Sequence, residues 1–153
     1  MSPAVSAGDH VVMEKVTFLF RKPHRGDIVA FKTDGITSLQ PGKLSFPPGT
    51  FYVKRIAGEP GEHLQILDRQ LFINGNRIVI SNSAGAISYT SPVPSDLFII
   101  QTEHAIGADA YFVLGDNSTN SLDSRYFGAI PGANIAGKMV FCYWPPRRIG
   151  FIK

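Results

Sequence analysis

Turn-forming residues interrupt this chain at short intervals, and that feature constrains its fold most. The 153 residues include 15 Gly and 11 Pro, an above-average share that favours many turns. Short runs of β-branched and aromatic residues lie between the turns, as is typical of strands. No segment has the apolar periodicity of a helix of about ten residues. The sequence therefore predicts an all-β fold, a barrel or a folded sheet, with little helix.

Strands are expected at the short apolar runs: residues 10–20, 27–31, 51–56, 63–67, 70–73, 97–100, 111–114 and 137–144. The pair Asn74-Gly75 is the strongest hairpin signal, because both residues tolerate the backbone of a tight primed turn. Residues 34–50 and 81–97 are rich in Gly, Pro and Ser and are predicted as loops. One helical turn is expected within residues 131–135.

Composition and charge exclude several functional classes. The length and a hydrophobic share of 44% allow one domain with a real core. The net charge of +3 is modest and its cations are scattered, which argues against nucleic-acid binding. The same charge fits a mild attraction to an anionic membrane surface. No apolar stretch approaches the ~18 residues of a membrane span, and no signal-peptide pattern opens the chain.

The sequence predicts no metal and no cofactor. A single cysteine, Cys142, excludes an internal disulfide and a cysteine-rich metal site. The four histidines are far apart in the sequence, and there is no Gly-rich phosphate loop. The run that begins at Asp116 faintly resembles a calcium loop, but its sixth residue is Ser121 and its twelfth is Phe127, where that loop requires Gly and Glu.

The segment Gly115–Gly128 is a polar loop with a regular pattern. It opens with the turn residues Gly115-Asp116-Asn117. Ser121, Asp123 and Arg125 then alternate, so an extended chain would place all three on one face. There the hydroxyl, carboxylate and guanidinium can hold one another through charge-assisted hydrogen bonds. On these residues alone, the segment is a polar surface loop.

The predicted strand at 51–56 contains two adjacent cations. Alternation puts Tyr52, Lys54 and Ile56 on one face and Arg55 on the other, so the pattern does not tell which cation is buried. A buried Lys54 would have a lowered pKa and could act as a neutral general base. A lysine whose stem covers apolar surface while its head reaches water is the alternative, and these six residues alone favour it.

Three internal segments resemble the type I signal peptidases, the membrane-anchored serine proteases that remove signal peptides from exported proteins. The segment R-G-D-I-V-A-F at 25–31 is similar to one family motif, and V-K-R-I-A-G-E-P-G at 53–61 is similar to the family's lysine motif. The third is G-D-N-S-T-N-S-L-D-S-R-Y-F-G at 115–128. The segments follow the family's order and span most of the chain. The resemblance implies an all-β fold like that of the signal peptidases and of LexA-type domains.

The resemblance assigns roles to individual residues. The family uses a serine nucleophile and a lysine general base, and Lys54 matches the base. Ser121 matches the residue that hydrogen-bonds and orients the lysine. Asp123 and Arg125 match an ion pair that holds the loop, whose turn is supported by Asp116 and Asn117. No cofactor is implied.

Further matches concern the substrate. Tyr52, Val53 and Met1 match positions that line the groove for small residues of an Ala-x-Ala cleavage site. The substrate would lie there extended, like an added strand. The implied partners are signal peptides of exported preproteins and a membrane surface, with no nucleic acid. The implied location is a membrane-anchored protein with its catalytic domain on the outer face of that membrane, whether periplasmic, extracellular or lumenal.

A fourth segment concerns the nucleophile. The family motif is S-M-x-P, followed after five residues by Gly-Asp, and this chain opens Met1-Ser2-Pro3 with Gly8-Asp9 at the matching distance. The nucleophilic serine therefore belongs immediately before Met1 and is absent. Ser2 and Ser6 are out of register, and a misplacement of even ~1 Å is costly to catalysis. We expect the chain as given to be inactive.

The absent serine has three explanations. A truncated chain or a gene start assigned at an internal methionine would leave the serine and a membrane anchor upstream. A true pseudo-enzyme is the third, although Lys54 and the 115–128 loop are intact. We expect residues 1–153 to form one catalytic domain, with a core of about 1–61 and 111–153 and a variable lobe of about 62–110.

Two other functional classes remain open. A non-catalytic peptide-binding pseudo-peptidase would keep the groove without turnover. A self-cleaving LexA-type repressor domain would need a DNA-binding segment upstream and an internal Ala-Gly cleavage site, and the 115–128 motif does not suit that family.

Overall fold

Strands make up most of the regular structure in the computed structural model, which describes residues 1–37, 46–47, 49–90 and 103–153. The strands are β1 (His10–Glu14), β2 (Ile28–Lys32), β3 (Phe51–Gly58), β4 (His63–Leu67), β5 (Gln70–Ile73), β6 (Asn76–Ile78), β7 (Ser81–Asn82), β8 (Gly85–Ala86), β9 (His104–Ala105), β10 (Ala110–Leu114), β11 (Ile130–Pro131), β12 (Ile135–Trp144) and β13 (Gly150–Phe151). The described helices are single turns: α1 (Thr17–Phe20), η2 (Ser118–Asn120), α2 (Ser124–Phe127), η3 (Gly132–Asn134) and η4 (Pro146–Arg148). The predicted all-β class is confirmed.

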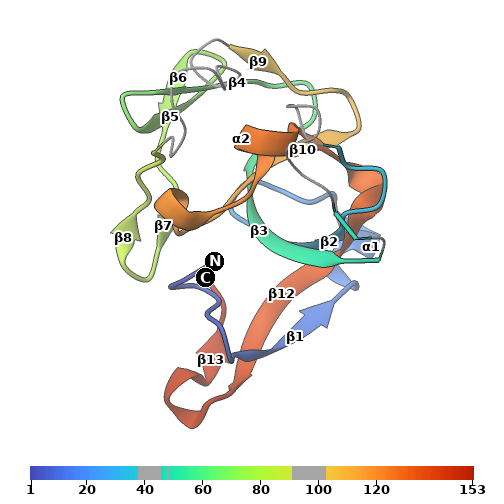
Figure 1. The fold of residues 1–153 in the computed structure, drawn as a ribbon, viewed down its shortest axis with the longest axis vertical. Coiled ribbons are helices and arrows are strands. Elements are labelled where there is room, and N and C mark those ends of the chain that lie inside the picture. The colour runs from blue at the N-terminus through green and yellow to red at the C-terminus, as the bar shows by residue number, and fades with distance from the viewer. Residues whose placement is uncertain (38–45, 48, 91–102) are drawn as a thin grey trace.

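The described strands form two main sheets (Figure 1). A seven-stranded sheet has the order β1-β12-β2-β3-β10-β11, with β13 paired to β12. A four-stranded sheet has the order β6-β5-β4-β9, and β7 and β8 form a small ribbon. All pairings are antiparallel, which suits the short connections between the strands. Strand β3 lies between β2 and β10 in the larger sheet: residues 51–55 pair with β2, and the second half, from Arg55 to Gly58, pairs with β10.

Two hydrophobic clusters cover the opposite faces of β3 and β10. Ile56 and Val113 belong to one cluster, together with Phe31. Ala57 and Phe112 belong to the other, which continues into the four-stranded sheet. Successive residues of a strand point to opposite faces, so β10 from Tyr111 onward and β3 from Arg55 onward are buried on both sides. The division into a core and a variable lobe stays a prediction, although β4 to β9 all lie within residues 63–105.

Most local predictions are confirmed. The Asn74-Gly75 turn joins β5 to β6 with φ angles of 50° and 76°, as a primed hairpin turn requires. The predicted helical turn is η3, and the last long strand is β12, which begins at Ile135 rather than at Gly137. The strand predicted at 97–100 lies outside the described residues, as do parts of both predicted loops. Within the loop predicted at 81–97, β7 and β8 pair as a two-residue ribbon.

The strand predicted over residues 10–20 is wrong in its second half. Strand β1 ends at Glu14, opposite Lys138 of β12, and α1 follows at Thr17. The Glu14 carboxylate accepts a hydrogen bond of 2.9 Å from the Thr17 backbone N–H. A carboxylate at this position satisfies a free N–H of the first turn. This local bond favours the helical turn over continued pairing.

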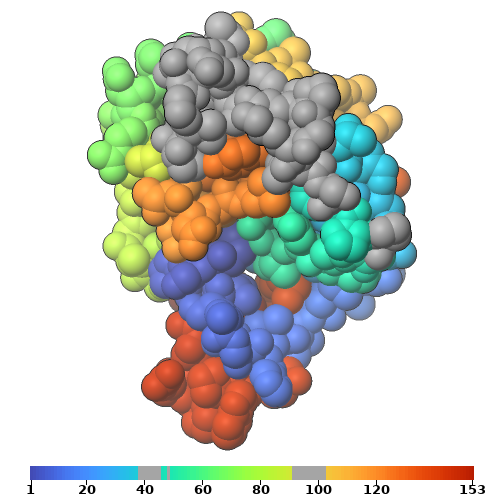
Figure 2. Space-filling model, viewed as in Figure 1, coloured from blue at the N-terminus to red at the C-terminus, as the bar shows by residue number. Residues whose placement is uncertain are grey.

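Both ends of the chain lie together near the middle of the molecule (Figure 1). Met1 and Ile152 pack against the same small cluster, which Met139 of β12 helps to form. Arg55 donates a hydrogen bond of 3.1 Å to the carbonyl of Lys153. In Figure 2, the dark blue first residues are next to the orange segment that contains α2. The start of the chain is therefore close to the 115–128 loop.

Candidate active site

Lys54 lies in the middle of β3, opposite Val29 of β2, and is partly buried. Its ammonium is 5.7 Å from the centre of the Tyr52 ring, as expected for residues two apart on one strand face. Desolvation lowers the pKa of Lys54. The charge of Arg125 lowers it further, whereas the carboxylates of Asp123 and Asp116 raise it. Since the net change is a decrease, the site favours a neutral amine more than water does.

Arg55, and not Lys54, is the fully buried cation of β3. Its side chain is 3% exposed and makes two 2.8 Å hydrogen bonds to the carboxylate of Asp116. It also donates to the carbonyl of Gly26. The planar guanidinium matches a carboxylate in this two-bond geometry, which an ammonium does not. The sequence pattern did not identify Arg55, because both faces of the strand mix one cation with apolar neighbours.

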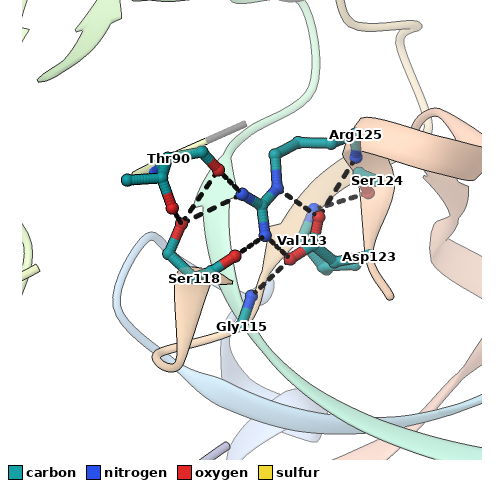
Figure 3. Close-up of polar contacts among 7 residues, drawn as sticks. All are labelled: Thr90, Val113, Gly115, Ser118, Asp123, Ser124 and Arg125. Carbon is teal, nitrogen blue, oxygen red and sulfur yellow. Dashed lines mark hydrogen bonds and ion pairs between the residues drawn. The ribbon is translucent and has the colours of Figure 1, made fainter. Parts of the chain in front are cut away.

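The Asp123–Arg125 ion pair is present and fully buried (Figure 3). Asp123 is 0% exposed and caps α2 by accepting a 3.2 Å hydrogen bond from the Arg125 N–H. It also accepts from the Arg125 side chain and, at 2.9 Å, from the backbone N–H of Gly115. The carboxylate therefore joins the beginning of the loop to its end.

Ser121 lies directly against Gly115. A Cβ at Gly115 would be 2.0 Å from the Ser121 Oγ, so this contact requires a glycine. The Ser121 Oγ is buried and has no hydrogen-bond partner among the described residues. The hydrogen bond predicted between Ser121 and Lys54 is thus not formed in this structure, and the orienting role of Ser121 stays a prediction. The hydroxyl retains its full capacity to donate and accept.

The loop has two further anchors that sequence reasoning missed. The Arg125 guanidinium also contacts Ser118 and the carbonyl of Thr90 (Figure 3). Thr90 is 28 residues before Ser118, and no local pattern connects the two. Asn117, predicted as turn support, is exposed, and its carbonyl accepts a 3.1 Å hydrogen bond from the Asn120 N–H.

The predicted substrate-contacting residues are on two surfaces. Met1 and Val53 pack against one cluster, whereas Tyr52 packs against the cluster of Phe31 and Phe127 on the other face of β3. Burial lowers the pKa of the Met1 amino group, and the charge of Lys54 lowers it further. Met1 is therefore close enough to Lys54 for their charges to interact. Among the described residues, no group of three or more His, Cys, Asp or Glu could hold a metal ion.

Comparison with known proteins identifies the family. The model of the family "Signal peptidase, peptidase S26" matches residues 1–144, a range that includes Lys54 and the whole 115–128 loop. The chain belongs to the signal peptidase family. No helix in the described part of the chain is long and apolar enough to cross a membrane.

Relatives in this family cover nearly all of the chain. Thylakoidal processing peptidase 1 of Arabidopsis thaliana is 33% identical over 149 residues, which are 97% of this chain and 41% of that protein. Signal peptidase I of Leptolyngbya laminosa is 31% identical over 150 residues, 98% of this chain and 67% of that protein. The chain thus spans two-fifths to two-thirds of the length of these curated relatives.

A solved structure supports the same fold. The crystal structure of a signal peptidase I from Enterococcus faecalis matches with a TM-score of 0.53 and 30% sequence identity. The match covers 77% of this chain and 97% of that one. The fold predicted from the signal peptidase motifs is therefore confirmed.

Proposed function

We propose that this chain is the catalytic domain of a serine endopeptidase that removes signal peptides from exported preproteins, with Lys54 as its general base. The observation that carries the proposal is a partly buried lysine, within the residues that match the signal peptidase family, whose charge interacts with the buried Asp123–Arg125 pair and whose pKa burial lowers. A general base must be neutral, close to the proton that it removes and held in place. Burial of Lys54 favours the first condition, and its place in β3, paired with Val29 of β2, fixes the backbone for the third.

The nucleophile of the proposed dyad is a serine immediately before Met1. Support comes from the Met1 amino group, which is near enough to Lys54 for the lysine charge to lower its pKa. Neutral Lys54 would take the hydroxyl proton as the serine oxygen attacks the scissile carbonyl carbon. The protonated amine would then give that proton to the leaving amine, and water would hydrolyse the acyl ester. Ser121 would orient Lys54.

The proposed substrate is an extended peptide with small residues at an Ala-x-Ala cleavage site. Met1, whose amino group interacts with the charge of Lys54, packs with Val53 against one cluster, and the two would form one wall of the groove. An extended peptide can add to a sheet as a further strand, with pockets that select alternate side chains. Since such substrates emerge from membranes, we propose that the enzyme works at the outer face of a membrane.

The test compares residues 1–153 with the same chain carrying one serine before Met1. We expect no cleavage of an Ala-x-Ala peptide by the first and measurable cleavage by the second. Lys54→Ala should lower kcat/KM by about 10³-fold, whereas the exposed Lys22→Ala should not change it. Because burial lowers the Lys54 pKa, the rate should rise with pH and level off below the ordinary lysine range.

Three outcomes would contradict the proposal. Cleavage by residues 1–153 that is lost on Lys54→Ala would contradict the assigned nucleophile. Cleavage by the serine-extended chain that persists in Lys54→Ala would contradict the assigned base. Peptide binding without turnover by the folded, serine-extended chain would instead favour a peptide-binding module.

A further inference from the structure

The hydroxyl of Ser118 donates one hydrogen bond and accepts two. Its oxygen accepts a 2.7 Å bond from the Thr90 N–H and a 2.9 Å bond from the Arg125 guanidinium. Its proton is donated to the Thr90 carbonyl at 3.2 Å. A hydroxyl has one donor and two acceptor positions, so all three are occupied. The Ser118 residue is only 5% exposed.

One guanidinium joins both ends of a short segment of the loop. Arg125 bonds the hydroxyl and carbonyl of Ser118 on one side and both carboxylate oxygens of Asp123 on the other. Figure 3 shows the guanidinium between these two groups. Ser121 lies midway along the segment closed in this way, where its hydroxyl has no partner of its own. The position of Ser121 thus depends on contacts made by its neighbours.

The bonds to Thr90 connect the loop to the rest of the molecule. Thr90 follows Tyr89, which is buried in the cluster shared with the four-stranded sheet. The 2.7 Å and 3.2 Å hydrogen bonds between Thr90 and Ser118 are made by the backbone of Thr90. They therefore do not depend on the side chain at position 90. Within the part of the chain that the structure describes, the hydroxyl of the exposed neighbour Thr119 makes a single hydrogen bond, 3.2 Å to the Asn117 side chain. Thr119 is therefore a matched control for the loss of one hydroxyl.

We propose that Ser118 is a positioning residue of the candidate active site, which fixes Arg125 against the Thr90 backbone and holds the loop of Ser121 beside Lys54. This inference rests on the proposed role of Lys54. Removal of the hydroxyl leaves the partly buried Thr90 N–H without this partner and the guanidinium less constrained. Since an unpaired buried donor is costly, the loop should shift until water reaches these groups.

The test measures the pKa of Lys54 in residues 1–153 by carbon NMR titration, with Lys54→Arg to assign the signal. Four charged groups act on Lys54: Asp123, Arg125, Asp116 and the Met1 amino group. Ser118→Ala should raise the Lys54 pKa by about half a unit or more. Hydration of Lys54 acts in that direction and removes the largest influence on its pKa, whereas withdrawal of Arg125 and withdrawal of its partner Asp123 act in opposite directions. Ser118→Thr, which keeps the hydroxyl, and Thr119→Ala should leave the value unchanged.

A folded Ser118→Ala variant with an unchanged Lys54 pKa would overturn the proposal. If Ser118→Ala does not fold, Ser118→Cys takes its place in the same titration, because a thiol keeps the volume but is a weak donor and acceptor. It should raise the Lys54 pKa in the same direction, and an unchanged value would overturn the proposal. An equal shift in Thr119→Ala would also overturn it. The titration requires no catalytic activity, so its result is distinct from any failure of Lys54 as the catalytic base.

Discussion

Two buried ion pairs determine the local geometry around Lys54. Arg55 is paired with Asp116, and Arg125 with Asp123, each through two side-chain hydrogen bonds. Removal of charges from water is costly, so such pairs contribute little net stability. They do penalise any arrangement that separates the partners. We therefore infer that the pairs mainly define one position for each end of the loop.

At the same scale, the contact between Gly115 and Ser121 leads to a direct prediction. In Gly115→Ala the new Cβ would be 2.0 Å from the Ser121 Oγ and 2.6 Å from its Cβ. Overpacking of this kind should cost about 1–3 kcal/mol of unfolding free energy, measured by urea denaturation. Gly107→Ala is the control, because its nearest neighbour would be 3.7 Å away. Equal stability of the two variants would show that Ser121 moves aside freely.

At the scale of elements, Asp27 joins three segments at the start of β2. Its carboxylate accepts hydrogen bonds from Arg21, which follows α1, and from the His24 backbone N–H. Lys138 of β12 is 2.8 Å away. Burial alone would raise the Asp27 pKa, but the bonds from Arg21, Lys138 and His24 outweigh it and lower the pKa to about 2.

A pH-dependent stability follows from Asp27. Because its folded pKa lies below the unfolded value, its contribution of about 2 kcal/mol is present above pH ~4 and is lost as the pH falls towards 2. Asp27→Asn should therefore be less stable than the original chain near neutral pH, with a shallower loss of stability in acid. Urea unfolding between pH 3 and 6 measures this slope. The exposed Asp109→Asn should keep the original slope, and an identical slope for Asp27→Asn would contradict the prediction.

At the scale of the whole molecule, one hydrophobic cluster joins the two sheets. Phe112 and Leu114 of β10 belong to the same cluster as Leu64 of β4 and Leu71 of β5. Since neither sheet can expose this surface without the other, we expect the described residues to unfold as one cooperative unit.

Leu71→Ala tests this cooperativity. Leu71 is 1% exposed and lies in the four-stranded sheet, so its truncation should cost about 2–5 kcal/mol. Fluorescence of Trp144 in β12, the single tryptophan, and far-UV circular dichroism should report one shared, shifted transition. Leu67→Ala, at a position 45% exposed, should shift it far less. Two separate transitions in Leu71→Ala would mean that the sheets unfold independently.

The sequence by itself determined those features that depend on neighbours along the chain. The hairpin at Asn74-Gly75 follows from backbone freedom at two adjacent residues. The ion pair expected between Asp123 and Arg125 is present at 2.8 Å, although the extended conformation predicted for this stretch is wrong, because Asp123 caps helix α2 and Arg125 lies in it. The strand at 51–56 and the signal peptidase motifs were evident from the residue pattern. Each is visible in residues that are few positions apart, although the strand at 51–56 is completed by pairing with the distant strands β2 and β10.

Only the tertiary structure decided those features that depend on distant partners. Arg55 is buried because Asp116, 61 residues away, receives it, and alternation along β3 contains no information about that partner. The contact of Ser118 with Thr90 and the close approach of Ser121 to Gly115 likewise come from folding. A periodic pattern shows which side chains share a face, but their burial depends on what packs against that face.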